Sequence, residues 1–189
     1  MKEEITRQSV LLFEQKGFSE TSIQDIADAL GVTKGTFYYY FSSKEQLLME
    51  IHDDYITNLV RRQERITQDP SLSERDKITG IIHLLITDID DKGPSARVYS
   101  REMLHLGKEH AKSIRQKRET FRLNIEAVLR EGIEQGEFDR RMHADMIAFG
   151  ILGVTNWSYN WFNPHGEVSP VALAEMFAGM ILNGIGLAD

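Results

Sequence analysis

The tract TSIQDIADALGVTKGTFYYYF, residues 21–41, constrains the fold more than any other part of the chain. In its first half, apolar residues recur at the spacing of one helix face, at Ile23, Ile26, Ala27 and Leu30. Gly31 follows where a left-handed residue can end that helix, and Thr33 stands where a side-chain oxygen can cap the next one. Two short helices joined by such a tight turn form a helix-turn-helix, whose second helix enters the major groove of DNA.

The second helix of this motif carries side chains suited to DNA contact. Lys34 lies in the first turn, where recognition helices reach base edges, and Gly35 lets the backbone approach closely. Hydroxyl and ammonium groups that can bind phosphates follow at Thr36, Tyr38, Tyr39 and Lys44. The aromatic residues expected to pack inside are Phe37, Tyr40 and Phe41.

The rest of the sequence predicts helices throughout. No stretch alternates long enough to form a strand, and the four prolines fall between stretches of helical periodicity, at Pro70, Pro94, Pro164 and Pro170. The periodicity predicts helices at 2–16, 22–29, 33–40, 43–67, 73–90, 95–106, 108–135, 143–162 and 169–187. We therefore expect an all-α chain with two domains, a three-helix helix-turn-helix domain at 1–47 and a larger helical domain at 48–189.

Composition excludes several classes of protein. The net charge is −7, which argues against a non-specific nucleic-acid binder but not against a sequence-specific one. The chain has no cysteine, and therefore no disulfide, thiolate nucleophile or Cys-ligated zinc. No apolar run reaches the length of about 18 residues that a membrane span needs, so we expect a cytoplasmic protein without a membrane partner.

The N-terminal motifs resemble those of the TetR/AcrR family. They are Gly17-Phe18, Thr-Ser-Ile-x-x-Ile-Ala, Gly-Val-Thr-Lys-Gly-Thr-Phe-Tyr-Tyr-Tyr-Phe and Ser-Lys-Glu-x-Leu, spread over residues 5–48. The resemblance implies a dimeric, ligand-responsive transcriptional regulator, usually a repressor, that binds a palindromic operator in double-stranded DNA. The resemblance implies that the following residues contact DNA: Thr21, Ser22, Thr33, Lys34, Gly35, Thr36, Tyr38, Tyr39 and Lys44.

This DNA-binding domain is slightly acidic. Residues 1–47 hold five Lys or Arg and seven Asp or Glu. We therefore expect moderate affinity per domain, and tight binding only through the dimer.

The last two helices predict the dimer interface. Apolar residues recur there at helical spacing, at Ile147, Ile151, Val154, Tyr159, Leu173, Phe177, Ile181 and Ile185. Small residues that allow close helix approach accompany them, at Gly150, Gly153, Gly179 and Gly184. Two helices from each subunit would form a four-helix bundle, with Ile151, Val154, Phe177 and Ile181 at the interface.

Residues 92–122 are basic within an acidic chain. They hold nine Lys or Arg against three Glu, a net charge of +6: Lys92, Arg97, Arg101, Lys108, Lys112, Arg115, Lys117, Arg118 and Arg122 against Glu102, Glu109 and Glu119. Five of the basic residues lie near one helical stripe, namely Lys108, Lys112, Arg115, Arg118 and Arg122. An anion such as a phosphate would neutralise the charges of this stripe. The alternative is a solvated face with exposed charges.

The segment 157–170 and the tail after it resemble those of TetR regulators that respond to acyl-CoA thioesters. The resemblance implies a small-molecule effector, with an apolar tunnel for the acyl chain and a basic mouth for the CoA phosphates, and no cofactor. The expected effector-binding residues are Leu85, Ile89, Arg97, Arg101, Met103, Leu104, Lys108, Lys112, Arg115, Arg118, Phe121, Arg122, Ile125, Trp157 and Trp161. Leu106 is a further wall candidate, and core packing is the alternative for each apolar member of the set.

Two other functions remain open from the sequence. A multidrug-type repressor could hold a lipophilic cation in an aromatic cage of Trp157, Tyr159 and Trp161, with a carboxylate from Asp88, Asp90, Asp91 or Glu102. A metal protein or enzyme could use His105, Glu109 and His110, although Gly107 interrupts the helical spacing. No nucleophile elbow, phosphate-binding glycine loop or Ser/His/Asp spacing occurs, so we expect no catalytic residues.

Overall fold

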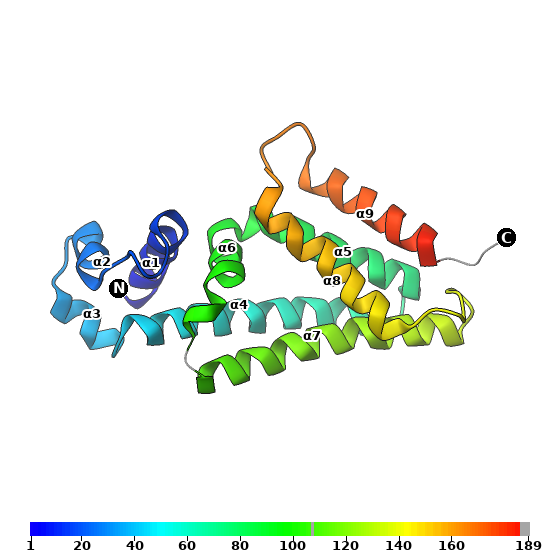
Figure 1. Ribbon diagram of the computed structural model, residues 1–189, viewed down its shortest axis with the longest axis horizontal. Helices are drawn as coiled ribbons and strands as arrows, with labels where there is room; N and C mark the ends of the chain where they lie inside the picture. Colours follow the sequence, from blue (N-terminus) through cyan, green and yellow to red (C-terminus); the bar gives the residue numbers. More distant parts are fainter. Residues whose placement is uncertain (107, 186–189) are drawn as a thin grey trace. The chain divides into compact units, whose positions relative to one another are not determined.

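The chain folds as an all-α protein in the computed structural model, which describes residues 1–106 and 108–185 (Figure 1). Side chains are described except those of Asp91, Met103, Leu104, Lys108, Glu109 and His110. Within this described part the regular elements are helices and no strand occurs, which confirms the predicted fold class.

The helices follow the predicted order. They are α1 (Lys2–Lys16), α2 (Ile23–Leu30), α3 (Lys34–Tyr40), α4 (Lys44–Thr67), α5 (Glu74–Asp91), α6 (Gly93–Arg101), η1 (Glu102–His105), α7 (Lys108–Glu134), α8 (Ala144–Trp161) and α9 (Pro170–Ile185). The predicted helix 95–106 differs most, because α6 begins two residues earlier and gives way to the 3-10 helix η1. Pro94 lies in the first turn of α6, where its missing N–H has no helical partner to lose.

The chain divides into two compact units. The first comprises residues 1–57 and 92–115, and the second comprises residues 58–91 and 116 onward. The divisions fall inside α4, between α5 and α6, and inside α7, and the segment that carries α6 and η1 belongs to the same unit as α1–α3. The predicted division at residue 47 remains a prediction about function.

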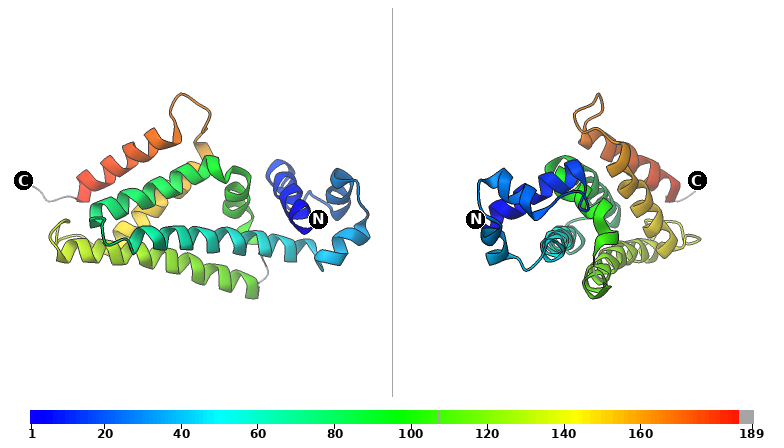
Figure 2. Two further views of the ribbon diagram at one scale, coloured as in Figure 1. Left: turned by 180° about the vertical axis from the view of Figure 1, so that it is seen from behind. Right: turned by 60° about the vertical axis from the view of Figure 1, so that its left-hand side comes forward.

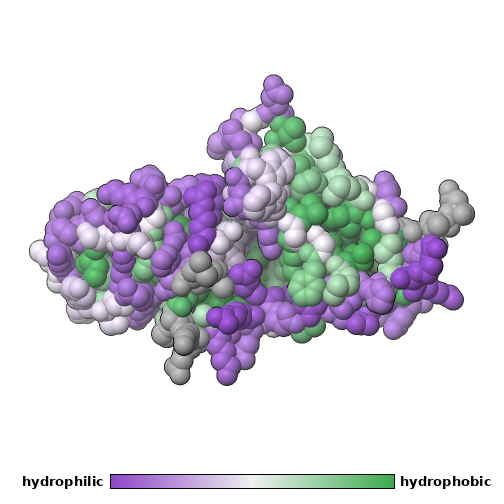
Figure 3. Space-filling model, in the orientation of Figure 1, coloured by the Kyte–Doolittle hydropathy of each residue, from purple (hydrophilic) through white to green (hydrophobic). Residues whose placement is uncertain are grey.

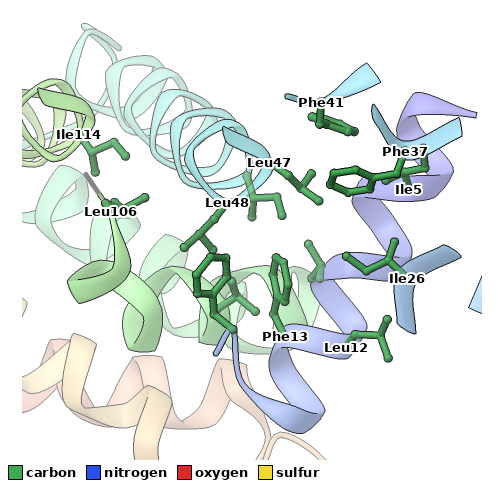
Figure 4. Close-up of a cluster of buried hydrophobic side chains, with 14 of the residues drawn as sticks. Ile5, Leu12, Phe13, Ile26, Phe37, Phe41, Leu47, Leu48, Leu106 and Ile114 are labelled. Atoms are coloured by element: carbon green, nitrogen blue, oxygen red, sulfur yellow. The ribbon is translucent and has the colours of Figure 1, made fainter. Parts of the chain in front are cut away.

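A continuous apolar core holds the first unit together (Figure 4). Phe13, Ile26 and Phe37 come from the three short helices, and each is at most 1% exposed. Leu47 and Leu48 add the first turn of α4, and residues of the second segment join the same cluster at Val98, Leu106, Ala111 and Ile114. The burial of these side chains is the main force that orders helices too short to be stable alone.

The second unit packs α5 against α8 and α9 (Figure 2). A row of buried apolar residues lies on α5, at Ile78, Ile81, Ile82, Leu85, Ile86 and Ile89, and Ile125 of α7 and Ile151 of α8 are buried as well. Near the end of α7, Gly132 leaves room for the ring of Phe138, which is 1% exposed. A Cβ at residue 132 would overlap that ring and lie 3.1 Å from the Cβ of Glu74.

Candidate DNA-binding and effector-binding sites

Local backbone and side-chain contacts define both ends of α2 and the start of α3. Ser22 caps α2, because its Oγ accepts from the Asp25 backbone N–H at 3.1 Å while the Asp25 carboxylate accepts from the Ser22 N–H at 2.7 Å. The bonds from Ser22 hold the pKa of the half-buried Asp25 carboxyl below its usual value. Gly31 ends α2 in the left-handed region at φ 65°, and Thr33 Oγ1 caps α3 by accepting from the Thr36 N–H at 3.3 Å.

One side of α3 is presented to solvent. Phe37 is 0% exposed and anchors the inner side, whereas Tyr38 and Tyr39 are 54% and 81% exposed. Lys34 and Gly35 are also exposed in the first turn of the helix. The Lys34 ammonium and the two phenol hydroxyls can donate hydrogen bonds to DNA phosphates and to acceptors on base edges. Their contact with DNA stays a prediction.

Thr21 is buried, which corrects its place in the predicted DNA-contacting set. Its side chain is 0% exposed, and its hydroxyl donates to the carbonyls of Gly17 at 2.8 Å and Leu12 at 3.3 Å. The side chain therefore closes the turn after α1 and does not reach a phosphate. Ser22, next to it, is exposed, with its hydroxyl engaged by the cap of α2.

Lys44 has a structural role that the sequence did not indicate. Its Nζ donates to the carbonyls of Phe18 and Thr21, both at 2.6 Å, and lies 4.3 Å from the centre of the Phe18 ring. Two of the three ammonium donors are thus engaged within the first unit. Contact of Lys44 with a phosphate stays a prediction that must use its remaining donor.

Several predicted effector-binding residues line the interior of the second unit. Leu85, Ile89, Phe121 and Ile125 are at most 3% exposed. Buried polar groups accompany them: Gln63 Nε2 donates to the Phe121 carbonyl at 2.8 Å, and Tyr159 OH donates to the Leu85 carbonyl at 3.1 Å.

Trp157 and Trp161 lie outside that interior. They are 66% and 53% exposed on α8, so they do not line a tunnel within the protomer as the sequence predicted. The sequence could not distinguish the faces of α8, because apolar residues occur on both of them.

The predicted basic residues fall into two groups. Arg101, Lys112, Arg115 and Arg118 are exposed. Arg97 instead pairs with Glu14, and Arg122 is bound by Glu119 and by Glu126 at 2.7 Å and lies 4.9 Å from the Phe149 ring centre. These carboxylates raise the pKa of Arg122 above its usual value, so its charge is already compensated. Lys108, Met103 and Leu104 have side chains outside the described part.

An exposed apolar face covers α8 and α9 (Figure 3). Large side chains that are at least half exposed form it, at Met146, Phe149, Trp157, Trp161, Val171, Met176 and Met180. Exposed glycines lie among them at Gly150, Gly153 and Gly184, where an added Cβ would meet no heavy atom within 4 Å. This set, here called the α8–α9 face, differs from the predicted interface. Ile151 is 1% exposed inside the protomer, which corrects its assignment, and the partly buried residues are Val154, Phe177 and Ile181.

A polar cavity that sequence reasoning missed lies between α7 and the start of α5. Its volume is about 420 Å³, and its lining consists of Thr67, Glu74, Lys77, Asn124, Ala127, Val128, Glu131 and Gln135. None of the predicted effector-binding residues belongs to this lining. The polar residues concerned carry no motif, so the sequence held no signal for the cavity.

The described residues form neither a membrane span nor a cluster of metal ligands. No helix there is long and apolar enough to cross a membrane. No group of three or more His, Cys, Asp or Glu in that part is placed to hold a metal ion. In the predicted metal group, the side chains of Glu109 and His110 lie outside the described residues.

Comparison with known proteins covers almost the whole chain. Residues 5–51 match the family model described as "Bacterial regulatory proteins, tetR family", and residues 71–185 match "Tetracyclin repressor-like, C-terminal domain". The chain is 25% identical over 185 residues to the HTH-type transcriptional repressor KstR2 of Mycolicibacterium smegmatis, covering 97% of this chain and 90% of the relative.

Solved structures share the fold. The ketosteroid transcriptional regulator KstR2 of Mycobacterium tuberculosis superposes with a TM-score of 0.91 at 23% identity, covering 99% of this chain and 95% of that one. AibR, crystallised in complex with isovaleryl coenzyme A and operator DNA, superposes with a TM-score of 0.86 at 23% identity, covering 95% of this chain and 96% of that one.

Proposed function

Because the chain belongs to the TetR family of bacterial regulatory proteins, we propose that it is a homodimeric transcriptional repressor released from its operator by an acyl-CoA thioester. Residues 1–47 would bind DNA, and residues 48–189 would bind the effector and the second subunit. The repressor assignment is supported by full-length similarity to proteins named as transcriptional repressors, a role without catalysis.

The exposed side of α3 is the observation that carries DNA binding. Lys34, Tyr38 and Tyr39 project from a helix that is capped at Thr33 and anchored by Phe37. Few phosphate contacts are available on an acidic domain, so each domain alone should bind weakly. Two copies related by a two-fold axis would occupy successive major grooves of a palindromic operator, and their binding free energies would combine.

The α8–α9 face supports the dimer. A contiguous apolar surface with exposed methionine, phenylalanine and tryptophan is typical of a protein interface rather than of a solvated helix pair. Exposed glycines on α8 would let a second copy of that helix approach closely. The face would serve as the self-complementary surface that a two-fold dimer requires.

Charge supports an anionic effector over a lipophilic cation. The buried carboxylate of Asp88, 1% exposed, is already bound by the Arg62 guanidinium, so it is not available to a cationic drug. Exposed Arg101, Lys112 and Arg115 instead offer cations that CoA phosphates can bind. AibR provides a precedent for this fold accommodating both an acyl-CoA and operator DNA.

The DNA-binding assignment is tested by fluorescence anisotropy on DNA from upstream of the protein's own gene. Lys34→Ala removes a charge-assisted contact of about 1.5–3 kcal/mol and should weaken binding about tenfold or more, while Tyr38→Phe should weaken it by a few fold. Tyr40→Phe is the matched control, since Tyr40 is half-buried on the same helix and is expected to pack. Unchanged affinity in both Lys34→Ala and Tyr38→Phe would overturn the assignment.

A further inference from the structure

An ion pair joins α1 of the DNA-binding region to α6. The Arg97 guanidinium donates from Nε at 2.7 Å and from Nη2 at 2.6 Å to the same carboxylate oxygen of Glu14. The two side chains are 25% and 22% exposed, so the pair is shielded from solvent but reachable from it. Gly93 leaves space for this guanidinium, because a Cβ there would lie 3.4 Å from Arg97 Nη2.

A second contact from the same segment holds the turn that follows α1. Glu102, the first residue of η1, is 9% exposed, and its Oε1 accepts from the Phe18 backbone N–H at 3.4 Å. Its other oxygen lies 3.4 Å from His105 Nε2, and the His105 ring packs 5.3 Å from the Phe18 ring. Residues 97–105 therefore bind both α1 and the turn after it.

That turn leads directly into the DNA-binding helices. Lys44, at the start of α4, donates to the carbonyls of Phe18 and Thr21, so the turn is held on one side by α4 and on the other by η1. The next residue, Ser22, is the cap of α2. A displacement of α1 and the turn would therefore move α2 and, through the Gly31 turn, the exposed side of α3.

We propose that the Glu14–Arg97 ion pair is a latch that holds the DNA-binding conformation, and that an anionic group of the effector opens it by replacing the Glu14 carboxylate on Arg97. This inference rests on the proposed function, and it assigns Arg97 the role of the residue that couples the effector to α1. One guanidinium cannot present the same two donors to both a carboxylate and a phosphate, and arginine binds phosphate strongly. The effector therefore binds the unlatched state more tightly, which is the differential affinity that any such shift needs.

Operator affinity and acyl-CoA affinity of the full chain test the latch, measured by anisotropy and by calorimetry with octanoyl-CoA as probe and free CoA as control. Glu14→Gln keeps the shape of the side chain but removes the ion pair, and should weaken operator binding without octanoyl-CoA by about twofold to fivefold. Because octanoyl-CoA binds the unlatched state, which this change populates, its binding should tighten. A role in folding alone would not tighten effector binding.

Arg97→Gln should weaken operator binding to a similar extent and also abolish most of the release by octanoyl-CoA. The double variant should match Arg97→Gln alone, since both changes break one interaction. Glu50→Gln is the matched control, because it removes another ion pair of α1, to Lys2 at 2.8 Å, that does not involve α6. It should leave the octanoyl-CoA response unchanged.

The possible failures are distinguishable. If octanoyl-CoA releases wild-type protein from DNA and releases Arg97→Gln equally well, the latch is wrong while the proposed function stands. If wild type ignores octanoyl-CoA, the acyl-CoA effector is wrong and the latch fails with it as an acyl-CoA switch. Tighter operator binding by Glu14→Gln would overturn the assignment of the latched state to DNA binding. Melting temperatures equal to wild type within about 2 °C establish that each variant is folded.

Discussion

Gly153→Ala separates the energetics of the single chain from those of the dimer. Gly153 lies inside α8 and is exposed on the α8–α9 face, and a Cβ there would meet no heavy atom of the chain within 4 Å. Alanine stabilises a helix interior by about 1 kcal/mol relative to glycine. The isolated chain should therefore gain about 0.5–1 kcal/mol of unfolding free energy, which raises its melting temperature by about 1–4 °C.

The same substitution should weaken the dimer. A two-fold interface places Gly153 of both subunits in the contact, so two methyl groups enter one interface. Overpacking costs about 1–3 kcal/mol per site, hence about 2 kcal/mol or more in total. The dimer dissociation constant should rise about 30-fold or more.

Sedimentation equilibrium gives the dimer dissociation constant, and melting curves at low and high protein concentration give the two stabilities. The substitution should raise the melting temperature of the monomer and lower that of the dimer. Thr120→Ala, at an exposed position of α7 outside the α8–α9 face, controls for helix propensity and should leave dimerisation unchanged. A Gly153→Ala protein that is stabilised and dimerises like wild type would refute the α8–α9 face as the interface.

Three further predictions concern other regions. The operator affinity of Lys34→Ala should decrease less steeply with added salt than that of wild type, because one phosphate or base contact with its released counterion is lost; equal slopes would argue against contact. Gly132→Ala should lower unfolding free energy by about 1–3 kcal/mol, since a Cβ overlaps the buried Phe138 ring, and Phe138→Leu in the same chain should recover part of the loss in chemical denaturation. The hydrogen bond from the Arg141 side chain, and then that from its backbone, lower the pKa of Asp139 to about 2 from 3.8. Its stabilising contribution is therefore complete above about pH 4 and is lost as the pH falls toward 2. NMR titration of Arg141→Gln should show a higher Asp139 pKa than in wild type, still below its usual value because the backbone hydrogen bond from residue 141 remains.

The helices could be predicted because their signals are local. Ser22, Gly31 and Thr33 act on backbone groups within a few residues, and the structure places each at the helix end that its chemistry favours. The helix at 95–106 was the exception, since its sequence did not reveal that the helix would begin around Pro94 and tighten into η1. That choice depends on packing, to which Val98 and Leu106 contribute, rather than on capping.

The site residues could be predicted less well, because their roles depend on contacts between distant segments. Thr21 looks like a surface hydroxyl, yet it is buried by the turn after α1. Lys44 finds its carbonyl partners more than twenty residues away. The sequence predicted Ile151 at the dimer interface and Trp157 inside the protomer, whereas packing of α8 against α5 buries Ile151 and leaves Trp157 exposed.

Release of the operator by effector tests the central claim most directly. Fluorescence anisotropy of operator DNA bound to the full chain should fall to the value of free DNA as octanoyl-CoA is added, and free CoA at the same concentration should leave the complex intact. Release by neither compound, with a lipophilic cation releasing the DNA instead, would contradict the account.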